Sequence, residues 1–168
     1  VIVVRNHEVS PGDKEQGPFG ENLELLSKLS EADLYDYGRG NLPCLGGTST
    51  FVYNPASGEI ETEYLSLTGT IRNCAGGPTP WNSWISCEEN TSIANSKLEK
   101  NHGYNFEVPA SATPLLAKPQ PIKEMGRFNH EAVCVDPTTH IVYQTEDRGD
   151  GLIYRYLPNT KGNLLAGG

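Results

Sequence analysis

The stretch N-C-A-G-G-P-T-P-W-N-S-W-I-S-C-E-E-N, residues 73–90, holds the side chains in this sequence best suited to chemistry. Cys74 stands near its start, and Cys87 precedes the adjacent carboxylates of Glu88 and Glu89 at its end. A thiolate among carboxylates favours a transition metal, because soft sulfur contributes little to the binding of hard cations. A structural alternative is a Cys74–Cys87 disulfide, or two separately buried thiols. The residue pattern leaves both interpretations open.

Further carboxylates occur in short motifs beside expected strands. R-N-H-E and F-N-H-E end in Glu8 and Glu131, and T-E-D-R contains Glu146, Asp147 and Arg148. Clustered carboxylates repel one another unless a cation compensates their charge, and oxygen-rich sites suit calcium or a similar hard ion. Taken singly, each acidic residue is most simply a solvated surface group. The recurrence of the motifs favours a shared metal site.

Arginines stand beside these acidic motifs, at Arg72, Arg127 and Arg148. They are candidates to clamp a substrate oxyanion, or else they form surface salt bridges to neighbouring carboxylates. His102, which precedes an expected strand, has no identifiable partner. The sequence contains no G-x-S-x-G, P-loop, G-x-G-x-x-G or H-E-x-x-H motif. Serine hydrolase, nucleotide-binding and zincin functions are therefore disfavoured, which leaves metal-assisted chemistry.

Composition narrows the class of protein. At 168 residues the chain is long enough for one domain with a core, and its net charge of -8 disfavours a nucleic-acid or anionic membrane surface. The sequence has no run of 18 apolar residues that would span a bilayer. Its four cysteines form no C-x-x-C pair, which disfavours zinc ribbons and thioredoxin-like sites. Because the sequence begins V-I-V-V, as if inside a strand, we expect it to be part of a longer protein.

Short strands separated by turns dominate the rest of the pattern. Residues 48–64 and 131–147 each predict a hairpin, and the second continues through R-G-D-G into a third strand. Cys134 alternates with valines there and is expected in the core. Residues 21–30 alone look helical, and the Pro-rich residues 109–121 predict a surface connector. Repeated meanders predict an all-β fold, with the whole chain forming one incomplete β-propeller domain.

Several of these motifs, in this order, resemble the PhoX-type alkaline phosphatases. They are N-C-A-G-G-x-T-P-W-x-S-W-x-x-C-E-E-N, then H-G-Y-x-F-E-V-P, then G-R-F-N-H-E-A-V-x-V-D-P, then T-E-D-R-x-D-G-L-x-Y-R-Y-L-P. N-H-E near the start and G-G-T-S-T-F-V-Y-N-P extend the resemblance over nearly the whole chain. The resemblance is specific for the family and much less so for the substrate.

The resemblance implies a β-propeller phosphomonoesterase, exported in bacteria to the periplasm or the extracellular space, that acts on small phosphate esters. Its site would combine Fe³⁺ and Ca²⁺ around a bridging oxo group. Carried over to this sequence, Cys74 would ligate iron, Asn73 would face the substrate phosphate, and Arg148 would contact it. The implied metal-binding carboxylates are Glu8, Glu88, Glu89, Glu131, Glu146 and Asp147. Family members are longer, so further chain or a subunit would be needed to close the propeller.

Two other functions are compatible with the same residues. A non-catalytic, calcium-stabilised propeller module would keep the carboxylates and need no thiolate, and a Cys74–Cys87 disulfide would favour it. A related propeller hydrolase acting on lactones or phosphotriesters would use calcium alone. The thiol state of Cys74 and a substrate panel separate these functions from the phosphomonoesterase.

Overall fold

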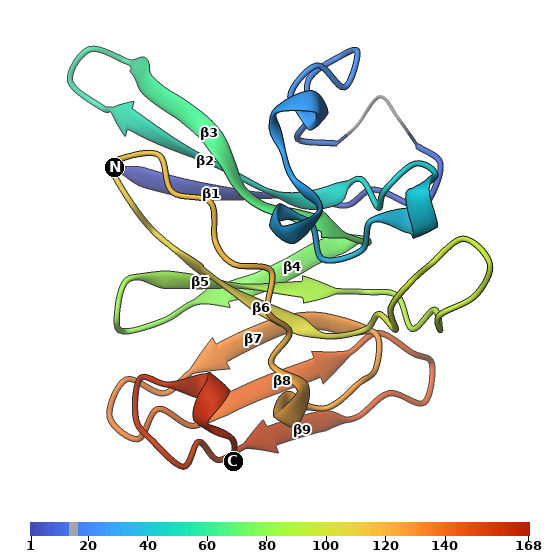
Figure 1. The fold of residues 1–168 in the computed structure, drawn as a ribbon. Helices are drawn as coiled ribbons and strands as arrows, with labels where there is room; N and C mark the ends of the chain where they lie inside the picture. Colours follow the sequence, from blue (N-terminus) through green and yellow to red (C-terminus); the bar gives the residue numbers. More distant parts are fainter. Residues whose placement is uncertain (14–16) are drawn as a thin grey trace.

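Three small antiparallel sheets form the protein in the computed structural model, which describes residues 1–13 and 17–168 (Figure 1). Each sheet is a three-stranded meander whose strand order follows the chain. Sheet A contains β1 (Ile2–His7), β2 (Gly46–Asn54) and β3 (Glu59–Thr70), and sheet B contains β4 (Asn73–Pro78), β5 (Ser83–Glu88) and β6 (Asn105–Pro109). Sheet C contains β7 (His130–Val135), β8 (Val142–Glu146) and β9 (Ile153–Tyr156). The prediction of an all-β fold is confirmed.

Helical structure in the described residues is limited to single 3₁₀ turns. They are η1 (Leu26–Lys28), η2 (Glu31–Asp33), η3 (Gly38–Gly40), η4 (Lys123–Met125) and η5 (Leu164–Ala166). No helix in residues 1–13 and 17–168 is long and apolar enough to cross a membrane.

The prediction of a helix over residues 21–30 is wrong. Leu23 has a φ of +58°, in the left-handed region that an α-helix excludes, so only η1 forms in this segment. Leu23, Leu26 and Leu29 nevertheless pack against a buried apolar cluster that includes Phe19. The leucine spacing therefore reports burial on one side of an irregular segment, which periodicity alone cannot distinguish from a short helix.

Both predicted hairpins are confirmed, because their turn residues act as the sequence indicates. At the β2–β3 turn the backbone N–H of Gly58 donates to the carbonyl of Asn54 at 2.8 Å, and Gly58 takes a φ of +76°. At the β7–β8 turn the carboxylate of Asp136 accepts the backbone N–H groups of Thr138 and Thr139. Strand β9 then completes the expected meander.

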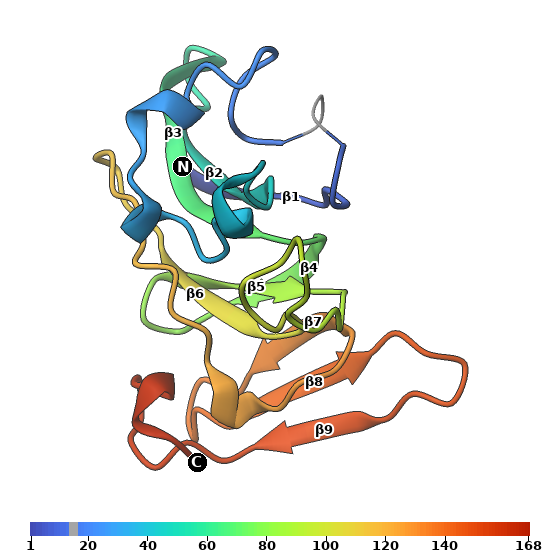
Figure 2. The same cartoon turned by 45° about the vertical axis from the view of Figure 1, so that its right-hand side comes forward.

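Sheet B lies between sheets A and C, in both views of the fold (Figures 1 and 2). Its strand β4 contacts β1 on one side and β7 on the other. Leu67, Phe106 and Val108 form the apolar contact between sheets A and B. The larger cluster between sheets B and C contains Ile85, Cys87, Ile122, Met125, Val133, Val135, Val142, Tyr156 and Leu164. Packing of stacked sheets therefore fixes where the strand ends of all three lie.

The prediction that Cys134 lies in the core is wrong, because Cys134 is exposed. Val133 and Val135 face the buried cluster against sheet B, so the alternation of a strand turns Cys134 to the solvent side of sheet C.

The Pro-rich segment 109–121 crosses back over sheets A and B. The backbone N–H of Ala117 in this segment donates to the Ser66 carbonyl of β3 at 2.8 Å.

Close approach of sheets B and C depends on Gly77 in β4. A Cβ atom at this position would lie 2.1 Å from the carbonyl oxygen of Val133, a backbone atom that cannot move alone. We predict that Gly77→Ala lowers the free energy of unfolding by about 1–3 kcal/mol, the usual cost of overpacking a core. Urea denaturation followed by circular dichroism measures the change.

Gly149→Ala is the matched control, because a Cβ there meets nothing within 4 Å. We expect it to change the unfolding free energy by less than about 0.5 kcal/mol, as for most surface substitutions. Equal stability of the two variants would contradict the packing of β4 against β7.

Candidate metal centre

Acidic residues from all three sheets lie at the same end of the stack. In sheet B the first residue of β4 pairs with the last of β5, and β7 and β8 of sheet C pair in the same way. Cys74 and Glu89 therefore lie together at one end of sheet B, and Glu131 and Asp147 lie together at the matching end of sheet C. Glu8 follows β1 of sheet A, whose neighbour β4 brings it to the same place.

The ligand atoms of these five residues form one continuous group. Those of Glu8, Cys74 and Glu89 lie within 4.8 Å of one another, and those of Glu89, Glu131 and Asp147 do likewise. Glu89 belongs to both sets. The thiol of Cys74 donates to Glu131 Oε1 across the sheet B–sheet C boundary, with a separation of 3.4 Å. We call these five residues the outer cluster, since Glu8 and Asp147 are exposed.

Arg72 is the one arginine that contacts the outer cluster in the described chain. Its Nη2 lies 2.9 Å from Glu8 Oε1 and 2.6 Å from Glu89 Oε2. Its backbone is fixed on both sides, because its N–H donates to the Val9 carbonyl and its carbonyl accepts the N–H of Glu89. Arg72 also takes a φ of +44°, which turns the chain sharply between β3 and β4.

The protonation equilibria of the outer cluster reflect crowded negative charge. Burial, a hydrogen bond with Asp147 and the nearby charges of Glu8 and Glu131 raise the pKa of Glu89 to about 7, although Arg72 opposes the shift. Burial and the neighbouring Glu131 carboxylate raise the pKa of the Cys74 thiol to about 12. A single guanidinium does not balance this set. The donor set therefore fits multivalent cations, one of which accepts sulfur.

Glu88, the last residue of β5, lies in the protein interior. Its carboxylate is fully buried and accepts from His102 Nδ1 at 2.7 Å. It also accepts three backbone N–H groups, those of Ile71, Gly103 and Tyr104, at 3.0, 2.8 and 3.2 Å. The structure thus does not bring Glu88 to the outer cluster, although the sequence pairs it with Glu89.

Three other residues expected at the site make different contacts. Asn73 is fully buried, where its amide donates to Ser86 Oγ at 2.9 Å and accepts from Thr70 Oγ1. Glu146 accepts a hydrogen bond from the hydroxyl of Tyr154 at 2.9 Å. Arg148 is exposed and pairs with Asp150, with 3.2 Å between Nε and Oδ1. The roles of Asn73, Glu146 and Arg148 in binding metal or phosphate stay predictions.

The cysteines are all free thiols in this structure, so Cys74 and Cys87 are not bridged. Cys87 is fully buried in the cluster between sheets B and C. Asn6, from the first N-H-E motif, instead fixes the backbone at Cys74. Its Nδ2 donates to the carbonyls of Cys74 and Ala75 at 3.2 and 2.6 Å, and its Oδ1 accepts from Trp84 and Ser86.

Sequence reasoning missed a buried ion-pair network formed by Asp36, His102 and Glu88. His102 bridges the two carboxylates, with its Nε2 lying 3.2 Å from Asp36 Oδ2. Burial works to lower the pKa of His102, but its hydrogen bonds to Asp36, Cys44 and Glu88 prevail and raise this pKa to about 11. This network therefore holds an imidazolium between two buried carboxylates. Only its long-range contacts reveal it, since Asp36 and His102 lie far apart in the sequence.

Comparison of the chain with protein-family profiles identifies the class of protein to which it belongs. The profile described as alkaline phosphatase PhoX matches residues 45–166, most of the chain, and this range includes every residue of the outer cluster except Glu8. The match assigns the chain to the phosphatases. More narrowly, the chain belongs to the PhoX family of alkaline phosphatases. No curated protein and no solved structure gives a significant match.

The contact between Cys74 and Glu131 is testable through thiol reactivity. Replacing Glu131 by Gln removes the negative charge that helps to raise the pKa of Cys74, so more thiolate forms at mildly alkaline pH. We expect Glu131→Gln to speed iodoacetamide alkylation of Cys74 in metal-free protein several-fold, at about tenfold per pKa unit lowered. Mass spectrometry of the Cys74 peptide measures the rate.

The exposed Cys134 gives an internal reference, because its alkylation should be unchanged. Glu63→Gln is the matched control, since Glu63 is paired with Arg5 on the surface of sheet A. Identical Cys74 rates in Glu131→Gln and the parent protein would show that the two side chains do not interact in solution.

Proposed function

We propose that the protein is a metal-dependent phosphomonoesterase whose site contains Fe³⁺ and Ca²⁺. One observation carries the proposal: in a chain of the PhoX family, the Cys74 thiol lies in a group of four carboxylates supplied by three sheets. A thiol whose pKa is raised to about 12 is a poor nucleophile unless a cation stabilises its thiolate. This favours a metal-ligand role for Cys74 over a role as the attacking group.

The donor types suggest how the cations divide. Glu8, Cys74 and Glu89 include sulfur, which suits iron, whereas Glu89, Glu131 and Asp147 offer oxygen alone, which suits calcium. Glu89 would bridge the two kinds of ion. When bound, the cations would polarise a phosphoryl oxygen and lower the pKa of a bound water. The proposal gives this chain's residues the task of holding the cations together and orienting the ester beside them.

Arg72 is placed to bind the phosphate of the substrate. Its planar guanidinium can donate two parallel hydrogen bonds to phosphate oxygens, and it already lies between Glu8 and Glu89. Cations bound to these carboxylates would release it toward the ester. Arg148, on the exposed turn that also carries Asp147, is the second candidate for a phosphate contact. Asn73 would act through β4, by fixing the start of the strand that presents Cys74.

We further propose that the three sheets are blades of a larger β-propeller, closed by further chain or a subunit. The first strands β1, β4 and β7 are in contact in that order, as inner strands around a channel would be. Ile153, on the last strand of sheet C, is 77% exposed, and a further blade packed beside sheet C would cover it. We place the activity outside the bacterial cytoplasm, in line with the resemblance described above.

Replacing Cys74 by Ser tests the function. We predict that the parent protein contains iron and calcium and hydrolyses p-nitrophenyl phosphate at alkaline pH. Cys74→Ser should lose iron and at least about 100-fold in activity, because even partners of metal ligands contribute about 10- to 100-fold. Elemental analysis and the rate of p-nitrophenol release are the measurements.

Cys134→Ser should keep both the metals and the activity, since Cys134 belongs to neither group of potential metal ligands. The melting temperature of Cys74→Ser shows whether the thiol is merely structural, in which case stability would fall before iron is lost. Freshly isolated protein without iron would contradict the proposal, and calcium with no hydrolysis would favour a calcium-stabilised binding module.

A further inference from the structure

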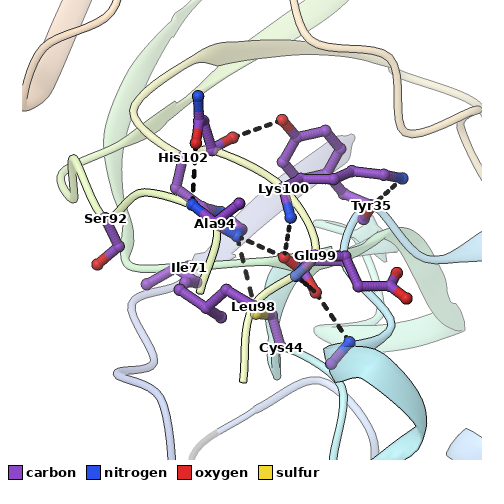
Figure 3. Close-up of polar contacts among 12 residues, drawn as sticks. Tyr35, Cys44, Ile71, Ser92, Ala94, Leu98, Glu99, Lys100 and His102 are labelled. Carbon is purple, nitrogen blue, oxygen red and sulfur yellow. Dashed lines mark hydrogen bonds and ion pairs between the residues drawn. The ribbon is translucent and has the colours of Figure 1, made fainter. Parts of the chain in front are cut away.

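A second group of potential metal ligands lies in the interior, beside sheet B. It consists of Asp36, Cys44 and His102, whose side chains are all buried. Figure 3 shows the contact between Cys44 and His102. Asp36 and Cys44 belong to the irregular segment before β2, and His102 belongs to the long loop between β5 and β6. Unlike the outer cluster, this group contains one sulfur, one nitrogen and one oxygen donor. We call it the inner triad.

The two separations measured from His102 Nε2 are close to the edges of a tetrahedron around zinc. His102 Nε2 lies 3.2 Å from Asp36 Oδ2 and 3.9 Å from Cys44 Sγ, and all three atoms lie within 4.8 Å of one another. Zinc bonds of about 2.0–2.2 Å to nitrogen and oxygen and about 2.3 Å to sulfur place such donors roughly 3.3–3.6 Å apart. Both separations measured from His102 Nε2 lie within a few tenths of an ångström of these values.

The other ring nitrogen of His102 has the partner that a metal-binding histidine requires. Nδ1 lies 2.7 Å from Glu88 Oε1, and backbone N–H groups hold the Glu88 carboxylate in place. Metal-bound histidines almost always donate their second ring N–H to such an acceptor, which fixes the tautomer and the ring orientation. In that tautomer the lone pair of Nε2 points toward Asp36 and Cys44.

The Asp36 carboxylate is fixed before any ion arrives. Its Oδ1 accepts the backbone N–H groups of Gly38 and Glu99, and its Oδ2 accepts that of Lys100. These donors stabilise the ionised carboxylate that a metal needs. Cys44 also belongs to a buried apolar cluster with Ile71 and Leu98.

We propose that Asp36, Cys44 and His102 bind a structural zinc ion, with a water or another small ligand in the fourth position. Sulfur and nitrogen donors favour zinc over calcium, and the charges of one thiolate and one carboxylate balance Zn²⁺. Binding forms one bond each to Sγ, Nε2 and Oδ2. It releases the thiol proton of Cys44 and the Nε2 proton of His102 to solvent. The ion joins the segment before β2 to the loop that follows Glu89.

Cobalt substitution tests this site. Cys74→Ser serves as the background, because a thiolate in the outer cluster could also bind cobalt. We expect metal-free Cys74→Ser protein to bind Co²⁺ with a thiolate-to-cobalt absorption band in the near ultraviolet and the intense visible bands of a tetrahedral ion. The double variant Cys74→Ser/Cys44→Ser should lose the thiolate band, and Cys74→Ser/Cys134→Ser should keep it.

A second measurement needs no change in the inner triad. Zinc X-ray absorption of zinc-loaded Cys74→Ser should show one sulfur neighbour at about 2.3 Å and the remaining neighbours at about 2.0–2.2 Å. Absence of the cobalt–thiolate band from Cys74→Ser, or its survival in Cys74→Ser/Cys44→Ser, would overturn the proposal. The inner triad would then be held together only by an ion pair and hydrogen bonds, with no metal ion. Because Cys74 is absent throughout, the result does not depend on the proposed phosphatase activity.

Discussion

The buried carboxylate of Glu88 is the interaction on which the rest of the site depends. It satisfies the backbone N–H groups of Ile71, Gly103 and Tyr104 and holds the ring of His102. These contacts join the β3–β4 connection to the loop after β5. Removing Glu88 would leave three unsatisfied N–H groups and a buried imidazolium paired on one side only, with Asp36, and such changes are strongly destabilising. The position of its neighbour Glu89 therefore follows from an interior constraint.

Charge at the outer cluster is balanced only in part by the protein itself. Arg72 contacts Glu8 and Glu89, yet Glu131 and Asp147 lie in the same group with no cationic side chain among their described contacts. Strand ends from separate sheets create this crowding, because antiparallel pairing brings the start of one strand beside the end of the next. Stacking of the sheets thus brings negatively charged side chains close together. Bound cations would stabilise both the site and the contacts between sheets.

Local signals allowed much of the fold to be predicted. Asn54 with Gly58, and Asp136 with its following threonines, specify their turns through short-range hydrogen bonds, so the hairpins followed from the sequence. Recurrent acidic motifs beside strands also indicated that Glu89 and Glu131 would meet. The left-handed Leu23 was not foreseeable, because its conformation is set by packing against residues distant in the chain.

Long-range contacts account for what the sequence left hidden at the site. Neighbouring residues of a strand point to opposite faces, yet nothing local says which of Glu88 and Glu89 turns inward. The contact with His102 holds Glu88 in the interior, and His102 is itself held by Asp36, which lies 66 residues before it in the chain. The single E-E pair consequently reaches two groups of ligands: Glu89 contributes to the outer cluster while Glu88 orients the histidine of the inner triad. An ion in the interior would thus act on the outer site through one peptide unit, by fixing the strand end from which Glu89 projects.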